Sequence, residues 1–258
     1  MPIVTITSDF GWNDFYLPVL KGAILTQNDQ IKLVDITHDI EPYDIVQAAY
    51  IFKNTWHHFP KGSIHLISVN NYYQKDCRYL TCEYDGHFFI APDNGLFSLV
   101  FENTFPALFE LSLAKNDNFP LVSAYANTIG KLSNGWPMEE IGQSTEDKLD
   151  RITLRPVVSP NQIRGSVIHV DRYGNVITNI PKTLFREVQN NRNFKLYFKR
   201  HDPIKRLSNH YHDVGIGELL CLFNHAQQLE IAVNMGEAST LFGLQVEDTI
   251  QIDFSTAS

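Results

Sequence analysis

The chain has 258 residues, of which 43% are apolar and 19% charged, and its formal net charge is −8. This length and composition allow one large or two smaller packed domains. The acidic balance argues against a nucleic-acid partner, because phosphate binding needs clustered lysine and arginine. Three cysteines, Cys77, Cys82 and Cys221, are too few for a disulfide framework, and no apolar run is long enough to span a membrane. We therefore expect a cytoplasmic globular protein that binds neither nucleic acid nor membrane.

The first clear structural signature is a buried strand that ends in acidic residues. Residues 2–8 are mostly β-branched or apolar, Asp9 follows at the end of the strand, and Asp14 lies near the start of a helix expected over 13–27. In an α/β sheet, polar groups at the carboxyl end of a strand form ligand sites. The plainer interpretation is that Asp9 closes a turn and Asp14 favours the helix dipole.

The rest of the first half alternates strands and helices. We expect strands at 31–36, 63–69, 79–83 and 87–91 and helices at 44–56 and 122–133. The βαβ order of the earlier elements is typical of a parallel sheet, whereas Asp85-Gly86 is a hairpin turn signal between the last two strands. The sequence therefore predicts an α/β domain with a mainly parallel sheet over residues 1–155.

The composition changes between 143 and 162, where charged residues and prolines replace periodic apolar residues. Short strands are expected after it, at 163–170, 193–198, 218–223, 229–233 and 249–252. Short strands without regular intervening helices predict a β-barrel or sandwich. We therefore place a smaller β-barrel domain at 156–258, with a long exposed loop at 199–213.

Polar residues follow each of the first three strands. They are Asp9 to Asp14, His38-Asp39 and Asn70-Asn71. Because the carboxyl ends of parallel strands meet at one edge of a sheet, we expect these residues to share a pocket.

A fourth polar turn lies in the second half and contains Asp171, Tyr173 and Asn175. An aromatic ring beside amide and carboxylate groups suits stacking on a planar base and hydrogen bonding to it, although a simple hairpin corner explains the same residues. Histidines in the 199–213 loop fit a solvated loop better than a metal site. No metal site is expected.

Motifs spread along the chain carry a family resemblance. They are Asp9-Phe-Gly-x-x-Asp14, Lys21-Gly22, Val34-Asp-Ile-Thr-His38, Pro42-Tyr-Asp44, Phe59-Pro-Lys-Gly-Ser-Ile-His65, Ala91-Pro-Asp-Asn-Gly95, His169-Val-Asp-Arg-Tyr-Gly-Asn175 and Glu230-Ile-Ala-Val-Asn234. In order, from about residue 3 to 252, they resemble the S-adenosyl-L-methionine (SAM) hydroxide adenosyltransferases, relatives of fluorinase and chlorinase. The resemblance implies an N-terminal α/β domain, a C-terminal β-barrel, and a homotrimer with active sites between the N-domain of one subunit and the C-domain of its neighbour.

The resemblance also implies roles for individual residues. Asp9 holds the ribose hydroxyls, Asp14 and Asp171 hold the methionine amino group, Tyr43 packs against the ligand, Tyr173 stacks on the base, and Asn175 and the backbone near Asn234 and Met235 contact adenine. Carboxylates suit an ammonium group because the hydrogen bond between them is charge-assisted.

The family's water-activating Asp, Arg and His are largely replaced. Asn70 stands in the loop where the family has the aspartate. The arginine position falls on Cys77, with Arg78 one place later, and the histidine position falls within 119–123, where there is no histidine. We take Asn70 and Arg78 as the catalytic candidates. Losing a general base typically costs about 10²–10⁴-fold in rate, so slow hydrolysis remains feasible.

The function implied is SAM hydrolysis, in which water displaces methionine at C5′ and leaves adenosine. SAM is the substrate, and no cofactor is expected. The reaction needs a nucleophile held in line and stripped of its water rather than a metal. Two alternatives stay open: a catalytically weak or inactive protein that binds SAM or adenosine, and adenosyl transfer to another nucleophile.

Overall fold

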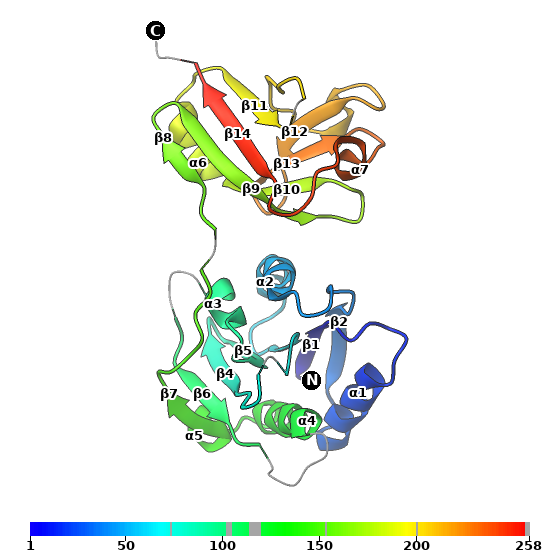
Figure 1. The fold of residues 1–258 in the computed structure, drawn as a ribbon. Helices are drawn as coiled ribbons and strands as arrows, with labels where there is room; N and C mark the ends of the chain where they lie inside the picture. Colours follow the sequence, from blue (N-terminus) through cyan, green and yellow to red (C-terminus); the bar gives the residue numbers. More distant parts are fainter. Residues whose placement is uncertain (73, 102–104, 114–119, 153, 200, 256–258) are drawn as a thin grey trace. The chain divides into compact units, whose positions relative to one another are not determined.

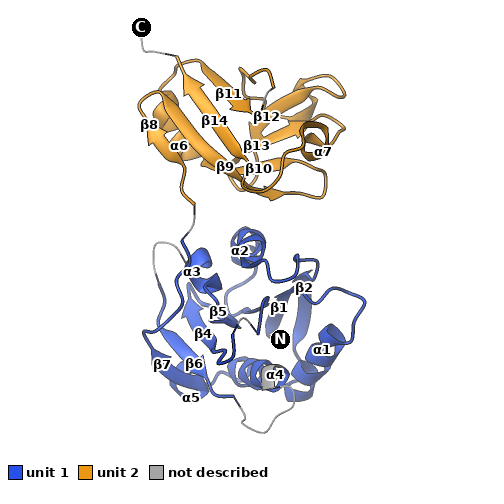
Figure 2. Ribbon diagram, viewed as in Figure 1, with its two compact units in different colours: residues 1–152 blue, residues 153–258 orange. Residues whose placement is uncertain are grey.

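The computed structural model describes residues 1–72, 74–101, 105–113, 120–152, 154–199 and 201–255 (Figure 1). The chain divides into two compact units, Met1–Ile152 and Thr153–Ser258 (Figure 2). The two-domain layout expected from the sequence is present. None of the helices in the described ranges has the length and apolar content that crossing a membrane requires.

Unit 1 is built on a seven-stranded sheet with the order β2-β1-β3-β5-β4-β6-β7. Its strands are β1 (Ile3–Ser8), β2 (Lys32–Thr37), β3 (Ile64–Ser68), β4 (Tyr79–Tyr84), β5 (His87–Pro92), β6 (Leu108–Leu111) and β7 (Gly142–Thr145). The pairs β1–β2, β1–β3 and β3–β5 are parallel, whereas β4–β5, β4–β6 and β6–β7 are antiparallel. The sheet is therefore mixed, and the prediction of a mainly parallel sheet is wrong.

The β4–β5 hairpin causes the change of direction. Asp85 and Gly86 both have positive φ, 48° and 76°. This is the backbone of a tight two-residue hairpin turn, and it sends β5 back antiparallel to β4. Beyond β4, the short strands β6 and β7 continue the antiparallel pairing to the edge of the sheet.

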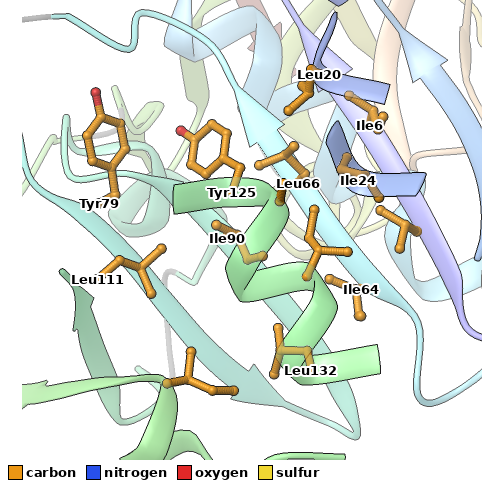
Figure 3. Close-up of a cluster of buried hydrophobic side chains, with 14 of the residues drawn as sticks. Ile6, Leu20, Ile24, Ile64, Leu66, Tyr79, Ile90, Leu111, Tyr125 and Leu132 are labelled. Carbon is orange, nitrogen blue, oxygen red and sulfur yellow. The ribbon is translucent and has the colours of Figure 1, made fainter. Parts of the chain in front are cut away.

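Helices cover both faces of this sheet. They are α1 (Tyr16–Gln27), α2 (Ile45–Lys53), the 3₁₀ turn η1 (Trp56–His58), α3 (Leu96–Val100), α4 (Pro120–Ser133) and α5 (Met138–Ile141). Leu20 and Ile24 of α1 and Tyr125 of α4 pack with Ile6 and Leu66 of the central strands in one buried cluster (Figure 3). A second cluster joins α2 and α3 to the opposite face. Burying each of these aliphatic side chains stabilises the fold by roughly 1.5–3 kcal/mol. The strand ends therefore extend from a well-packed core of three layers, with helices on both faces of the sheet.

Helix α1 begins at Tyr16, three residues later than the start expected near Asn13. Pro18 explains the shift, because proline lacks an N–H group and is tolerated only in the first helical turn. Asp14 therefore lies in the segment before the helix and is exposed. The N-cap is Phe15, which provides no side-chain hydrogen bond to the helix.

Helix α2 is shorter than the expected 44–56 but begins as predicted. The Asp44 side chain accepts hydrogen bonds from the backbone N–H groups of Val46 and Gln47, at 3.0 and 2.9 Å. This is the N-cap arrangement in which an aspartate satisfies the first free donors of a helix. It fixes the chain directly after Tyr43, one of the proposed ligand contacts.

A buried histidine of β3 lies in the middle of the sheet. The ring of His65 is fully buried, with Nδ1 2.7 Å from Thr5 Oγ1 and Nε2 3.0 Å from His87 Nδ1. Burial, with a smaller contribution from His87, lowers the pKa of His65 from 6.5 to about 3. The folded protein therefore keeps this ring neutral at pH values where the unfolded chain protonates it.

We expect the free energy of unfolding to fall as the pH drops below 6.5. The unfolded state takes up a proton there that folded His65 does not bind until about pH 3, so stability is lost on the acid side. The loss from this residue is about 1 kcal/mol between pH 6.5 and 5.5, at about 1.4 kcal/mol per pKa unit. Urea unfolding of the wild type, His65→Asn and the exposed-site control His57→Asn measures it. The assignment is wrong if His65→Asn keeps the full pH dependence.

Unit 2 is a curled antiparallel sheet with the order β11-β14-β9-β10-β13-β12 and β8 added to β9. Its elements are β8 (Val157–Ser159), β9 (Gln162–Val170), β10 (Val176–Pro181), α6 (Lys182–Gln189), β11 (Phe194–Phe198), η2 (Tyr211–Asp213), β12 (Leu219–Phe223), β13 (Gln228–Val233), α7 (Ala238–Phe242) and β14 (Thr249–Phe254). The first half of β9 pairs with β14 and the second half with β10, so the sheet curls along this strand.

The predicted barrel is a half-barrel. Among the described strands, β11 and β12 stand at opposite ends of the order and do not pair with each other, so the sheet does not close. Phe185 of α6 is fully buried in the core of the unit, together with Phe194 and Phe254.

Candidate functional site

The Asp9 carboxylate joins the three chain segments that follow β1, β2 and β3. Its Oδ2 accepts hydrogen bonds from the backbone N–H groups of Tyr43 and Asn70, both at 3.0 Å. Both donors have left-handed φ angles, 72° for Tyr43 and 51° for Asn70, a conformation that is uncommon for tyrosine and that asparagine tolerates more readily. Asp9 therefore organises the strand ends by joining two distant loops. Its other oxygen makes no hydrogen bond to the described residues.

A series of polar side-chain contacts holds the end of β1, directly before Asp9. Ser8 Oγ lies 2.7 Å from Nδ1 of His38, and His38 Nε2 lies 3.0 Å from Oδ1 of Asp35. Lys21 donates to the other Asp35 oxygen at 2.6 Å. Burial lowers the pKa of His38, although Asp35 acts in the opposite direction. The hydrogen bond between His38 and Ser8 fixes the residue directly before Asp9. Sequence reasoning placed His38 at this edge but assigned it no role.

The loop after β3 presents its two asparagines differently. Asn71 is buried, and its Oδ1 accepts from Tyr125 OH at 2.9 Å and from Ser68 Oγ at 3.2 Å. The Asn70 side chain is partly exposed and makes no hydrogen bond to the described residues. Asn71 therefore anchors the loop, whereas the Asn70 amide remains available. Tyr73, in the same loop, lies outside the described residues.

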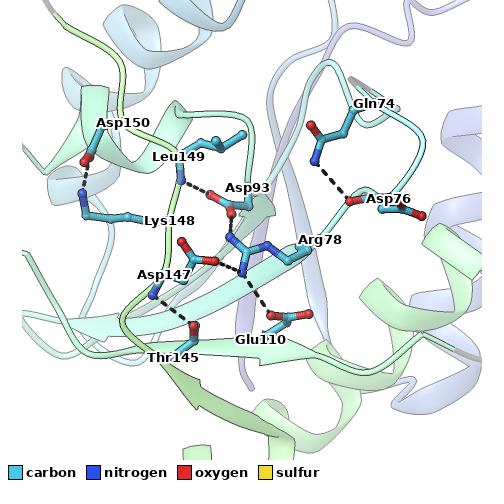
Figure 4. A network of polar contacts seen from close by, with 10 residues as sticks. All are labelled: Gln74, Asp76, Arg78, Asp93, Glu110, Thr145, Asp147, Lys148, Leu149 and Asp150. Carbon is cyan, nitrogen blue, oxygen red and sulfur yellow. Dashed lines mark hydrogen bonds and ion pairs between the residues drawn. The ribbon is translucent and has the colours of Figure 1, made fainter.

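Arg78 is held by three carboxylates (Figure 4). Its guanidinium pairs with Asp93, with Asp147 at 3.0 Å and with Glu110 at 3.4 Å. Asp93 is buried, and its second oxygen accepts from the Leu149 backbone N–H at 2.8 Å. The cluster ties β4, β6 and the segment after β7 to the loop after β5. This geometry favours a structural role for Arg78, and its predicted part in catalysis stays a prediction.

We expect Arg78→Lys to lower the free energy of unfolding by about 1–3 kcal/mol. A lysine keeps one charge but cannot bridge three carboxylates, and hydrogen bonds to charged groups contribute about 1.5–3 kcal/mol each. Arg164→Lys, at an exposed position of β9, is the matched control. Urea denaturation at pH 7 compares them. Unchanged stability of Arg78→Lys with lost turnover would instead favour the catalytic role.

Two other expected site positions are less informative. Asp14 is exposed and makes no hydrogen bond or ion pair with the described residues. Of the segment 119–123, where the resemblance places the family's histidine, Phe119 lies outside the described residues and the remainder begins α4.

In unit 2, Asp171 organises the turn between β9 and β10. Its Oδ1 accepts from the backbone N–H groups of Tyr173 and Asn175, both at 2.9 Å, and its Oδ2 accepts from the Asn175 side chain at 3.0 Å. Tyr173 is 76% exposed. A side chain at Gly174, where φ is 73°, would lie 2.7 Å from Glu237. The hairpin corner is present, and it carries both an exposed aromatic ring and a carboxylate held by three hydrogen bonds.

The chain after β13 lies against this turn, with the Ser239 N–H donating to Gly174 O at 2.9 Å. The Asn234 side chain donates to Val214 O at 2.8 Å, and Met235 is 85% exposed with a positive φ of 55°. Nearby, Tyr211 donates to buried Glu230 at 2.8 Å, and burial raises the pKa of Glu230. Asp171, Tyr173 and Asn175 thus share one turn of unit 2, and their part in ligand binding stays a prediction; the sequence did not indicate the Tyr211–Glu230 pair.

The fold and these sites define a class: a two-domain protein with an α/β unit carrying acidic and amide groups at its strand ends, followed by a curled β unit. Family profiles described as the SAM hydroxide adenosyltransferase N-terminal and C-terminal domains match residues 4–142 and 165–251. The chain belongs to the SAM hydroxide adenosyltransferase family.

Individual relatives agree with the family. The chain is 27% identical to the (R)-S-adenosyl-L-methionine hydrolase of Methanocaldococcus jannaschii, over 98% of this chain and 96% of the relative. It is 23% identical to the fluorinase of Nocardia brasiliensis, over 70% and 72%. A crystal structure of an uncharacterized conserved protein from Thermotoga maritima superposes with a TM-score of 0.87 at 28% identity, covering 97% of this chain and 99% of that one.

Proposed function

We propose that the protein hydrolyses SAM to adenosine and L-methionine. The observation that carries the proposal is the Asp9 carboxylate at the strand ends, which fixes two loops through Oδ2 and leaves its other oxygen for ribose hydroxyls. Family membership and the similarity to curated (R)-S-adenosyl-L-methionine hydrolases support it.

The chemistry asks little of the leaving group. The water oxygen uses a lone pair to bond to C5′ as the C5′–S bond breaks. The electron pair of the C5′–S bond stays on sulfur, which neutralises the sulfonium and leaves methionine as a thioether. The water proton passes to solvent. Because the departing methionine sulfur needs neither acid nor metal, catalysis reduces to positioning and desolvating the nucleophile.

The proposal gives each predicted residue a role. Asp9 binds the ribose, and Asp14 and Asp171 bind the methionine amino group. Tyr43 packs against the ligand and Tyr173 stacks on the adenine base. Asn175 and the backbone near Asn234 and Met235 contact adenine. Asn70 orients water, and an amide cannot take its proton. We accordingly expect slow turnover. A binding protein without turnover is the second candidate, favoured by the carboxylates that occupy Arg78.

Incubating the purified protein with SAM and following adenosine and methionine by chromatography tests the proposal. Calorimetry with SAM and with adenosine, in parallel, measures binding. Stoichiometric release of both products supports hydrolysis, and binding without products supports the second candidate. Absence of both binding and products contradicts each of them.

Assembly and location form part of the same proposal. We propose a homotrimer, as the family resemblance implies, in the cytoplasm, where the free thiols of Cys77, Cys82 and Cys221 would stay reduced. Light scattering measures the assembly mass directly.

A further inference from the structure

Asn94, in the loop after β5, contacts the backbone of the Asn70 loop. Its side-chain Nδ2 donates to Val69 O at 2.9 Å and to Asn70 O at 3.1 Å, and its Oδ1 accepts from Leu96 N at 3.2 Å. Asn94 is only 1% exposed. A buried amide with these three bonds has little freedom to rotate, so it holds the two carbonyl groups in a fixed direction.

Asn70 is thereby held from both sides. Its N–H donates to Asp9 Oδ2 at 3.0 Å, and its carbonyl accepts from Asn94. Its φ of 51° is left-handed, a conformation that asparagine tolerates better than most non-glycine residues and that these two bonds hold here. Together these contacts fix the backbone of Asn70 and so the direction of its Cα–Cβ bond, from which a side chain extends that makes no hydrogen bond to the described residues.

The Asn94 loop is itself immobilised from the outside. Asp93 N donates to Arg78 O at 2.9 Å, and the buried Asp93 carboxylate pairs with Arg78 (Figure 4). Arg151 covers Gly95 so closely that a side chain there would lie 2.2 Å from its Cγ. The Arg78 cluster thus braces the residue that holds Asn70.

We propose that Asn94 is a positioning residue for the reaction: it fixes the backbone of Asn70 and so places the Asn70 amide against the attacking water. The proposal rests on the proposed function. It also gives the Arg78 cluster an indirect role, through Asp93 and Asn94.

Asn94→Asp tests it, because aspartate keeps the volume and the acceptor for Leu96 N but removes both donors. Asn54→Asp is the control, since Asn54 makes the same kind of bond to Tyr50 O at 2.8 Å, at the end of α2. We expect the hydrogen of the Asn70 backbone N–H to exchange with solvent at least tenfold faster in Asn94→Asp than in the wild type, as measured by NMR. We expect kcat for SAM to fall at least tenfold while KM changes less than threefold. The control should show neither change.

The outcomes separate the parts of the proposal. Unchanged exchange of the Asn70 backbone N–H in Asn94→Asp contradicts the proposal that Asn94 fixes the backbone of Asn70. Faster exchange with unchanged kcat overturns the positioning role and leaves SAM hydrolysis standing. A wild type that does not turn over SAM overturns the proposed function, and the exchange measurement still shows whether Asn94 fixes the backbone of Asn70. Should Asn94→Asp not fold, Asn94→Ser, which retains one donor, is expected to show smaller changes in the same direction; no change in that variant counts against the proposal.

Discussion

Asp9→Ala is expected to weaken SAM binding by about 1.5–3 kcal/mol, on the order of 10–100-fold in Kd. The substitution removes the oxygen proposed to hold the ribose and the oxygen that accepts from Tyr43 and Asn70. The left-handed turns at those two residues then lose a partner, so the loops carrying the ligand contacts loosen as well.

Asp9→Asn separates the two effects. Its amide oxygen can still accept from Tyr43 and Asn70, whereas one acceptor for the ribose and the negative charge are lost. We expect it to bind SAM more tightly than Asp9→Ala and less tightly than the wild type. Asp29→Ala, an exposed aspartate in the turn before β2, controls for the change in net charge. Calorimetry with SAM compares the four proteins, and wild-type affinity in Asp9→Ala would remove Asp9 from the site.

Much of the first unit was predictable because its signals are local. The strand before Asp9 is buried along almost its whole length, Asp44 caps α2, and Asp85-Gly86 forms the predicted hairpin. The direction of pairing across the sheet was not predictable from the same signals. The predicted hairpin gives the antiparallel β4–β5 pair, but the further antiparallel pairs β4–β6 and β6–β7 involve strands that the sequence did not indicate, and they make the sheet mixed.

The missed elements are short or depend on distant contacts. β6 and β7 have four residues each, too few to show an alternating pattern, and they exist because they pair with each other and with β4. Helix α6 did leave a signal. Pro181 precedes it, and Leu184, Phe185 and Val188 lie at helical spacing.

The candidate site divides in the same way. Sequence alone placed Asp9 and Asn70 at one sheet edge, because the ends of parallel strands meet there, and the structure brings them within one hydrogen bond. It could not show that His38 supports Ser8 or that Asn94 holds Asn70. Those bonds join residues 30 and 24 positions apart, and no local pattern marks them.

Asn70→Asp is expected to raise the rate of SAM hydrolysis at least tenfold. General-base catalysis typically contributes about 10²–10⁴-fold, and we expect a gain toward the lower end because the family resemblance implies that the arginine and histidine positions are replaced as well. The substitution preserves size, and the backbone bonds to Asp9 and Asn94 do not involve the side chain that changes. The new carboxylate therefore replaces the amide without moving the loop.

The pH dependence of the variant shows whether the new group acts as a base. A carboxylate at position 70 lies close to Asp9, and a neighbouring like charge raises its pKa above that of an isolated aspartate. The rate should therefore rise with pH through this raised pKa and then level off, a limb that the wild type lacks. Gln74→Glu, which adds the same charge to an exposed position of the same loop, should leave rate and profile unchanged. An equal gain in Gln74→Glu would mean that net charge, rather than a base facing C5′, controls turnover.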